Sequence, residues 1–218
     1  MNPAIVYLVE LGSGAILVTA LAVIWRHSLQ AYIGAFRLQS FLLGAVAALL
    51  SQLQGSLELL GVALLIALVK GWFIPRFLRR LLARVGSGRE VRPYLNVAAS
   101  LLICGALVVV AYSATADLVA ASRLPTRNGV PLALAVVLIG FFVLISRRQA
   151  ITQVIGFLVL ENGIAMLALM VSYGLPLMVE LGVFLDVLIA LWIMQVVVYR
   201  IRDTFDTLDV TRLKGLRH

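Results

Sequence analysis

The sequence is dominated by long apolar segments that are separated by short polar or charged stretches. A helix that crosses a bilayer needs roughly 20 consecutive, mostly apolar residues, and seven segments of this chain approach or exceed that length. They cover residues 3–25, 38–54, 56–74, 93–115, 129–146, 150–173 and 176–200, and Pro75 is expected to stop the third. Because a bilayer offers no hydrogen bonds to an open backbone, the pattern predicts an all-α, polytopic transmembrane helix bundle of about seven spans.

Composition excludes a soluble protein of the same length. Of the 218 residues, 62% are hydrophobic and only 13% are charged, whereas a soluble domain has about 45–50% apolar and about 25% charged residues. The single cysteine, Cys104, lies in an apolar segment and gives no disulfide framework. Glu10 precedes most of the first apolar segment and no basic region does, so we interpret this segment as a retained span and not a signal peptide.

The basic residues fall on alternate sides of the predicted spans. If the N-terminus is outside and the C-terminus is cytoplasmic, 15 of the 18 Lys and Arg residues lie in inward-facing segments. These are Arg26, Arg37, Arg76, Arg79, Arg80, Arg84, Arg89, Arg92, Arg147, Arg148, Arg200, Arg202, Arg212, Lys214 and Arg217. The outward loops hold Arg123 and Arg127, and Lys70 lies within the third span. This asymmetry follows the positive-inside rule.

The charge pattern therefore predicts a multi-pass membrane protein. We expect it to lie in a bacterial or archaeal plasma (inner) membrane. The net charge of +8 is explained by topology and by contact with the lipid bilayer, so no nucleic acid partner is expected. Residues 76–84 (RFLRRLLAR) form a basic, amphipathic stretch. We interpret it as an interfacial helix or as an extension of the third span, with a docking face for a cytoplasmic partner as the alternative.

Ionisable residues inside the predicted spans are the candidates for chemistry, because each costs roughly 2.5–3.5 kcal/mol at the centre of a spanning helix. Glu161 lies eleven residues into the sixth span, and Asp186 lies ten residues into the seventh. At a rise of about 1.5 Å per residue both fall near the midplane, and the turn at Gly174 and Pro176 makes their helices antiparallel neighbours. Burial disfavours the charged form of a carboxyl, so the two acids predict a proton-transfer path.

Other polar residues in the spans leave alternatives open. Lys70 either snorkels to the inner boundary or pairs with a midplane carboxyl and joins the path. Glu180 either ends its helix or joins the path, and Asn162 is expected to hydrogen-bond across helices. Glu10 either faces the outer interface or pairs with another helix. The candidate proton-transfer residues are therefore Glu161, Asp186, Glu180 and Lys70.

No pattern of a soluble active site occurs in the sequence. His27 and His218 are isolated and lie outside the predicted spans, so no group of residues has the spacing of a metal site. There is also no phosphate-binding loop and no nucleophile triad. We expect no catalytic residue on this chain, no cofactor and no bound metal.

Four short motifs follow the start of the fifth predicted span: residues 144–149 (LISRRQ), 154–156 (VIG), 186–191 (DVLIAL) and 207–210 (TLDV). With them, this part of the chain resembles the K subunit of respiratory complex I and the C subunit of Mrp-type cation antiporters. That family has glutamate in place of Leu158 and of Asp186, and Glu161 follows Leu158 by nearly one helical turn. The resemblance implies a K-like three-span unit over 129–202, preceded by a four-span unit over 1–128 and followed by a cytoplasmic tail, 203–218.

Residues 67–75 (ALVKGWFIP), 160–164 (LENGI) and 179–186 (VELGVFLD) add to this pattern. Their order and spacing resemble component E of hydrogenase-4 and of related formate hydrogenlyase complexes, over the whole chain. The resemblance implies a noncatalytic membrane subunit of an oxidoreductase complex, between hydrogenase-linked and antiporter-like subunits. It also implies that the four candidate proton-transfer residues contribute to a lateral polar path.

Three functions remain open on the sequence. The first is a noncatalytic membrane subunit of a complex I-like, hydrogenase-linked respiratory assembly, with buried carboxyls in a proton or sodium translocation path. The second is a subunit of an Mrp-like or inorganic-carbon-type ion transport complex without redox chemistry. The third is a purely structural membrane scaffold. Genes for nickel-iron hydrogenase and iron–sulfur subunits next to the gene for this protein would favour the first function over the second. Assembly with normal coupled proton pumping by a Glu161→Gln variant would favour the third.

Overall fold

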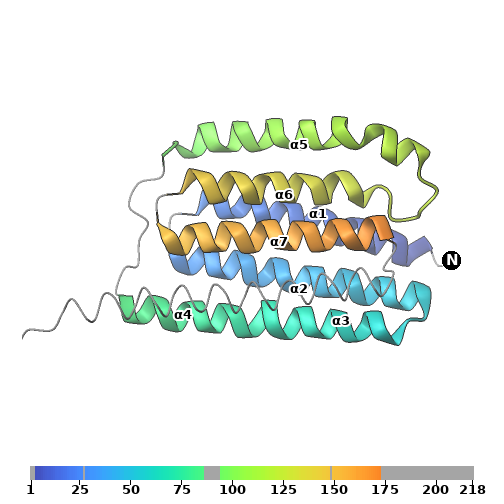
Figure 1. Ribbon diagram of the computed structural model, residues 1–218, viewed down its shortest axis with the longest axis horizontal. Helices are drawn as coiled ribbons and strands as arrows, with labels where there is room; N and C mark the ends of the chain where they lie inside the picture. Colours follow the sequence, from blue (N-terminus) through green and yellow to red (C-terminus); the bar gives the residue numbers. More distant parts are fainter. Residues whose placement is uncertain (1–2, 27, 86–93, 148, 173–218) are drawn as a thin grey trace, which may run out of the picture. The chain divides into compact units, whose positions relative to one another are not determined.

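Helices make up almost all of the computed structural model in the residues that it describes, 3–26, 28–85, 94–147 and 149–172. The elements are α1 (Pro3–Trp25), α2 (Leu29–Gln54), α3 (Leu57–Leu68), the π-helical segment η1 (Val69–Phe73), α4 (Ile74–Val85), α5 (Val97–Ala121), α6 (Gly129–Ser146) and α7 (Ala150–Ser172). Figure 1 shows these helices lying side by side along their length. The predicted all-α fold class is confirmed.

Six helical stretches in the described residues are long and apolar enough to cross a membrane. One of them, Leu57–Arg80, combines α3, η1 and part of α4. The predicted spans 3–25, 129–146 and 150–173 agree with α1, α6 and α7 to within one residue. The predicted seventh span, 176–200, lies outside the described residues, so the total of seven spans and the orientation of the termini stay predictions.

The second span begins nine residues earlier than predicted, at Leu29 instead of residue 38. Ser28 caps this helix, since its Oγ accepts a hydrogen bond from the backbone N–H of Ala31 at 3.3 Å. Arg37 therefore lies on the helix and not in a loop, and Gln39 and Ser40 lie near its middle. Gly55, with φ of 67°, ends α2 in the left-handed conformation, and the antiparallel α3 begins two residues later.

The expectation that Pro75 stops the third span is wrong, because the helix continues through it to Val85. A proline in an α-helix clashes with the carbonyl four residues earlier and lacks an N–H. Here the wider π-helical turn comes directly before it, and the backbone N–H of Ile74 bonds to the carbonyl of Val69, five residues earlier. The added residue relieves the clash, so residues 76–84 form a helical extension of the span, as one of the interpretations predicted.

The π-helical turn also keeps one side of this long helix against α2. Up to and including Lys70, the buried positions follow α-helical spacing. From Gly71 onward they again follow α-helical spacing, so the extra residue of the π-helical turn shifts the buried stripe by one position. The buried positions are Leu59, Ala63, Ile66, Lys70, Gly71, Pro75, Leu78 and Leu82.

The closest helix pair is α6 with α7. A Cβ atom added at Gly140 of α6 would collide with the backbone nitrogen of Leu160, and one added at Gly163 of α7 would lie 2.6 Å from the backbone nitrogen of Val137. Small residues at such positions let two spanning helices approach closely. This contact fixes one face of α7 against α6 and leaves Glu161 and Asn162 to face other helices.

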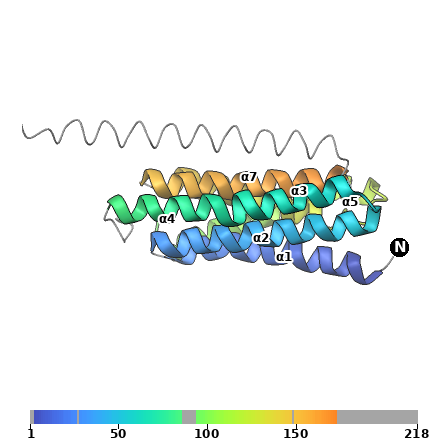
Figure 2. The same cartoon turned by 90° about the horizontal axis from the view of Figure 1, so that it is seen from below.

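The remaining helices pack around this pair. α1 contacts α2 and α6, and α2 also contacts α3, η1, α4 and α7; Figure 2 shows α1 and α2 side by side. α5 contacts α6 and α1 but leaves most of its side chains exposed, although Cys104 is buried. α6 and α7 thus touch α1 and α2 directly, across the predicted unit boundary at residue 128, which stays a prediction.

Candidate functional site: a buried polar cluster in the helix bundle

A buried ion pair joins α7 to η1. Glu161 is the central residue of α7, with eleven helical residues on either side. Its Oε2 atom lies 3.7 Å from Nζ of Lys70, and the two side chains are only 4% and 2% exposed. Of the two open interpretations of Lys70, the structure therefore favours pairing with a buried carboxyl over snorkelling to the boundary.

Hydrogen-bonded side chains from α2 lie beside this pair. The Nδ2 group of Asn162, next to Glu161, donates to Oε1 of Gln39 at 3.2 Å and to Oγ of Ser40 at 3.1 Å. Ser40 in turn donates to the carbonyl of Phe36. The amide of Gln39 donates to the carbonyl of Ile16 in α1 at 3.3 Å. The predicted hydrogen bond of Asn162 across helices is confirmed, and the polar cluster, defined as Gln39, Ser40, Lys70, Glu161 and Asn162, is linked to four helical elements.

Local sequence explains how Lys70 reaches the cluster. The π-helical turn places Lys70 and Gly71 together on the buried side of the helix. Gly71 has no side chain, so the Phe41 ring packs against its backbone, 2.9 Å from where a Cβ would lie. Gly44 similarly lets α2 approach the carbonyl of Ala63 in α3. Close contact of α2 with the third span carries the ammonium group inward toward α7.

Electrostatics favour keeping Lys70 and Glu161 together as a pair. Bringing a charge into a medium of low dielectric constant costs several kcal/mol, and a partner of opposite sign offsets this cost. Removing one member of such a pair leaves the other charge buried without compensation. The hydrogen-bonded amides of Gln39 and Asn162 hold the adjoining turn of α7 against α2. The arrangement can therefore hold a charge or a proton inside the bundle.

Four other acidic residues are not part of the described cluster. Glu10 accepts a hydrogen bond of 2.7 Å from Asn128 in an exposed position, and Glu58 is exposed in the first turn of α3, so neither belongs to the cluster. Glu180 and Asp186 lie outside the described residues, and their place in a polar path stays a prediction. Among the residues that the structure describes, no group of three or more His, Cys, Asp and Glu side chains could hold a metal ion.

Gln39 and Ser40 are members of the cluster that sequence reasoning missed. The predicted span began at residue 38, so both polar residues fell in its first turn, where polar side chains are common. The usable signal was Ser28, a good N-cap residue directly before an apolar run, which would have moved the helix start. With that start, Gln39 and Ser40 lie ten and eleven residues into a span, where polar side chains are candidates for a functional site.

Comparison with known proteins gives a relative that matches along almost the whole chain. The chain is 35% identical over 211 residues to the uncharacterized protein Rv0085 of Mycobacterium tuberculosis, and the match covers 96% of both chains. The chain belongs to the same protein family.

A more distant relative has a descriptive name. Hydrogenase-4 component E of Escherichia coli K12 is 26% identical over 209 residues, which cover 94% of this chain and 95% of the relative. The protein of that name in Shigella flexneri matches to the same extent. The chain is thus a distant homologue of hydrogenase-4 component E over most of its length. No family model and no solved structure matches the chain, and the likeness to the K subunit and the Mrp C subunit stays a prediction.

Proposed function

We propose that the protein is a noncatalytic membrane subunit of a complex I-like, hydrogenase-linked respiratory assembly, in which the polar cluster forms part of a proton or sodium translocation path. The homology to hydrogenase-4 component E and the six apolar spans support membership of a multi-subunit membrane complex. The observation that carries the proposal is the ion pair of Lys70 with Glu161, because intramembrane ionisable residues mark ion or proton pathways.

The pair can act in translocation because its two charges are coupled. A proton that binds Glu161 removes the negative charge and leaves the Lys70 ammonium without its counter-charge. At low dielectric constant such a change is felt strongly over several ångströms. A conformational change that separates the two charges would therefore favour proton uptake by the carboxyl, and its reversal would favour release. Asp186 and Glu180 are the proposed further members of the path.

A Glu161→Gln variant tests this role in the assembled complex. Glutamine keeps the shape and can accept a hydrogen bond from Lys70, but it does not titrate. Because the variant leaves Lys70 without its counter-charge, all rates are compared per assembled complex. On that basis we expect hydrogenase turnover to persist, while coupled ion translocation into inverted membrane vesicles falls roughly a hundredfold, the effect of losing a positioned proton-transfer group. The measurement is the quench of a pH-sensitive dye, with a membrane potential probe for sodium.

Glu58→Gln is the matched control, because Glu58 is exposed at the start of α3 and lies outside the cluster. This variant should translocate ions at the unaltered rate. Normal coupled pumping by Glu161→Gln would contradict the role of the pair and would favour the structural scaffold. Loss of pumping in both variants would mean that acid loss in general, and not the cluster, disturbs the complex.

The second candidate is a subunit of an Mrp-like or inorganic-carbon-type ion transport complex. The cluster fits this function equally well, because it carries no redox chemistry of its own. The proteins that co-purify with the chain in mild detergent distinguish the two. Nickel-iron and iron–sulfur subunits among them support the hydrogenase-linked assembly, and antiporter subunits without redox partners support the ion transport complex.

A further inference from the structure

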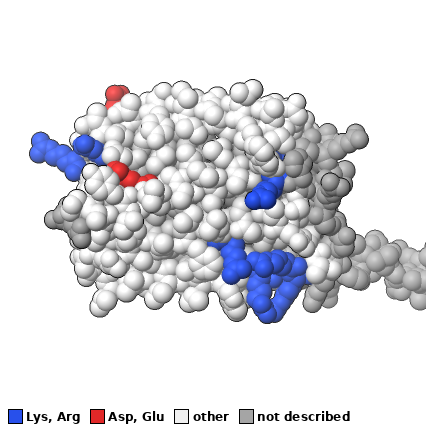
Figure 3. Space-filling view, turned by 180° about the vertical axis from the view of Figure 1, so that it is seen from behind, with Lys and Arg blue, Asp and Glu red and all other residues white. Residues whose placement is uncertain are grey.

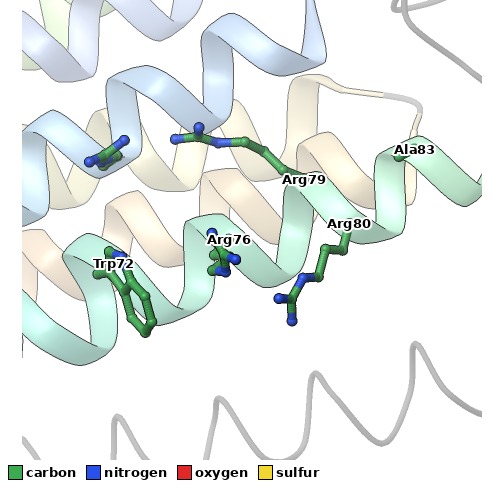
Figure 4. Close-up of a pocket in the computed structure, with 6 residues that line it drawn as sticks. Trp72, Arg76, Arg79, Arg80 and Ala83 are labelled. Atoms are coloured by element: carbon green, nitrogen blue, oxygen red, sulfur yellow. The ribbon is translucent and has the colours of Figure 1, made fainter.

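Arginines from two helices line a pocket at the end of the bundle where α2 begins and α4 ends. Its volume is about 530 Å³. The residues that line this arginine pocket are Arg37, Trp72, Arg76, Arg79, Arg80 and Ala83. Figure 3 shows one group of basic side chains at the lower edge of the molecular face, apart from the other basic side chains in this view. In Figure 4, Arg79 extends from α4 toward α2 across the pocket.

The four guanidinium groups have no carboxylate partner among the described residues. The acids in this part of the chain are Glu10, Glu58, Asp117 and Glu161, and none of them lines the pocket. Two of the arginines are held by aromatic rings instead: Arg37 lies 5.6 Å from the centroid of Phe41, and Arg76 lies 5.6 Å from that of Trp72. Four like charges at one place repel one another unless an anion binds between them.

The exposed surface next to the pocket is apolar on both helices. On α2, Leu38 directly follows Arg37 and Phe41 lies about one turn after it, and they are 54% and 39% exposed. On the third span, Leu68 precedes Trp72 by one turn and is 61% exposed. On both helices, the exposed side chains therefore change from basic to apolar at the same level. Trp72 lies at this level, and tryptophan is enriched at membrane interfaces.

We propose that the arginine pocket binds the phosphate headgroup of an anionic phospholipid, whose acyl chains lie along the apolar surface formed by Leu38, Phe41 and Leu68. Guanidinium groups bind phosphate oxygens through paired N–H donors. The adjoining apolar strip matches the tails of a lipid and gives no advantage to free phosphate. It also argues against an acidic protein segment, which would leave this strip uncovered. The proposal is independent of the function proposed for the polar cluster.

Native mass spectrometry of the full-length protein tests the site. The protein is released from detergent with phosphatidylglycerol, cardiolipin or zwitterionic phosphatidylcholine present, and the bound fraction of each lipid is titrated. The unaltered chain should prefer the anionic lipids. The double variant Arg76→Gln/Arg79→Gln should bind them roughly thirtyfold more weakly, since each basic residue near the surface contributes about a 5-fold attraction. Arg76→Lys/Arg79→Lys keeps the charge and should retain most of the binding.

The matched control is Arg26→Gln/Arg123→Gln, which removes two exposed arginines that do not line the pocket. It should leave lipid binding within about twofold of the unaltered chain, because salt screens exposed charges that do not contact the headgroup. Equal losses in the two glutamine variants, or no loss in either, would overturn the proposal. Inorganic phosphate should not displace the lipid, and displacement at millimolar concentration would identify a phosphate site instead.

A photoreactive residue at Ala83, which is exposed at the pocket, distinguishes the occupants in native membranes. Cross-linking to a phospholipid supports the proposal. Cross-linking to an acidic protein segment, from this chain or from a neighbouring subunit, with no lipid adduct, would overturn it.

Discussion

At the residue scale, Lys70 and Glu161 form a charged pair in the buried interior of the helix bundle. Neither charge would be stable there alone, because the cost of desolvation is offset only by the other charge and by nearby dipoles. The amide of Asn162 ties the same turn of α7 to Gln39 and Ser40, so the position of Glu161 is held by hydrogen bonds as well as by packing. The pair is therefore both a structural contact and the proposed site of ion translocation.

Breaking the pair should destabilise the fold more than removing it entirely. We expect Lys70→Met to lower the free energy of unfolding by about 3–5 kcal/mol, because it leaves the Glu161 carboxylate buried without a counter-charge. The double variant Lys70→Met/Glu161→Gln should recover most of this loss. Unfolding in mixed micelles, followed by circular dichroism, measures both values.

The exposed Arg123 supplies the matched control for this cycle. Arg123→Met should change the free energy of unfolding by no more than about 0.5 kcal/mol. If Lys70→Met were equally harmless, the ion pair would make no net contribution to stability.

At the element scale, two departures from regular helix packing create the site. The π-helical turn η1 places Gly71 beside Lys70 on the buried side and leaves Arg76, Arg79 and Arg80 exposed. The glycines of α6 and α7 bring these helices into backbone contact. Because the α6 side of α7 is tightly packed, Glu161 and Asn162 lie on other sides of α7, where they reach the third span and α2.

Replacing a contact glycine should separate α6 from α7. In Gly140→Ala, the added methyl group meets the backbone of Leu160, which cannot rotate away. We expect a loss of about 1–3 kcal/mol in the free energy of unfolding, measured in the same micelles.

Gly105→Ala in α5 is the control, since nothing lies within 4 Å of its added Cβ. It should be neutral or stabilising by up to about 1 kcal/mol, because alanine favours helix more than glycine does. Equal effects of the two substitutions would show that α6 and α7 tolerate greater separation.

At the scale of the whole molecule, the arginines are unequally distributed between the two ends of the described bundle. Arg37, Arg76, Arg79 and Arg80 lie at one end of the described bundle, whereas Arg127 follows the far end of α5. This distribution and the positive-inside rule support the predicted orientation, with the arginine pocket facing the cytoplasm. The exposed length of α5 offers a further surface to lipid or to a neighbouring subunit.

Cysteine labelling tests this orientation. In a Cys104→Ala background, Arg123→Cys should react with a membrane-impermeant maleimide in spheroplasts, and Arg26→Cys should react only after the membrane is opened. Both positions are exposed at helix ends, so accessibility does not limit the reaction. The reverse pattern would contradict the predicted orientation, and reaction of both in sealed spheroplasts would contradict the span count between them.

The sequence alone determined the all-α class and the limits of α1, α6 and α7, because the length of an apolar run sets where a helix can lie in a bilayer. It also identified Glu161 and Lys70 as candidate functional residues, since a charged side chain within a membrane-spanning segment carries an energetic cost. It did not determine the start of α2 or the passage through Pro75. Both depend on local hydrogen bonds, at Ser28 and at Ile74, to which hydropathy is insensitive.

Only the tertiary structure decided which residues meet. Lys70 and Glu161 are ninety-one positions apart in the sequence. Their contact depends on the π-helical turn and on the orientation of α7, which is set by close glycine contacts with α6. Gln39 and Ser40 lie at the same depth as Asn162 because α2 begins at Leu29, and only the structure shows that start. A periodic pattern states which face of a helix is apolar, but the partner of a buried charge is fixed by the packing of several helices at once.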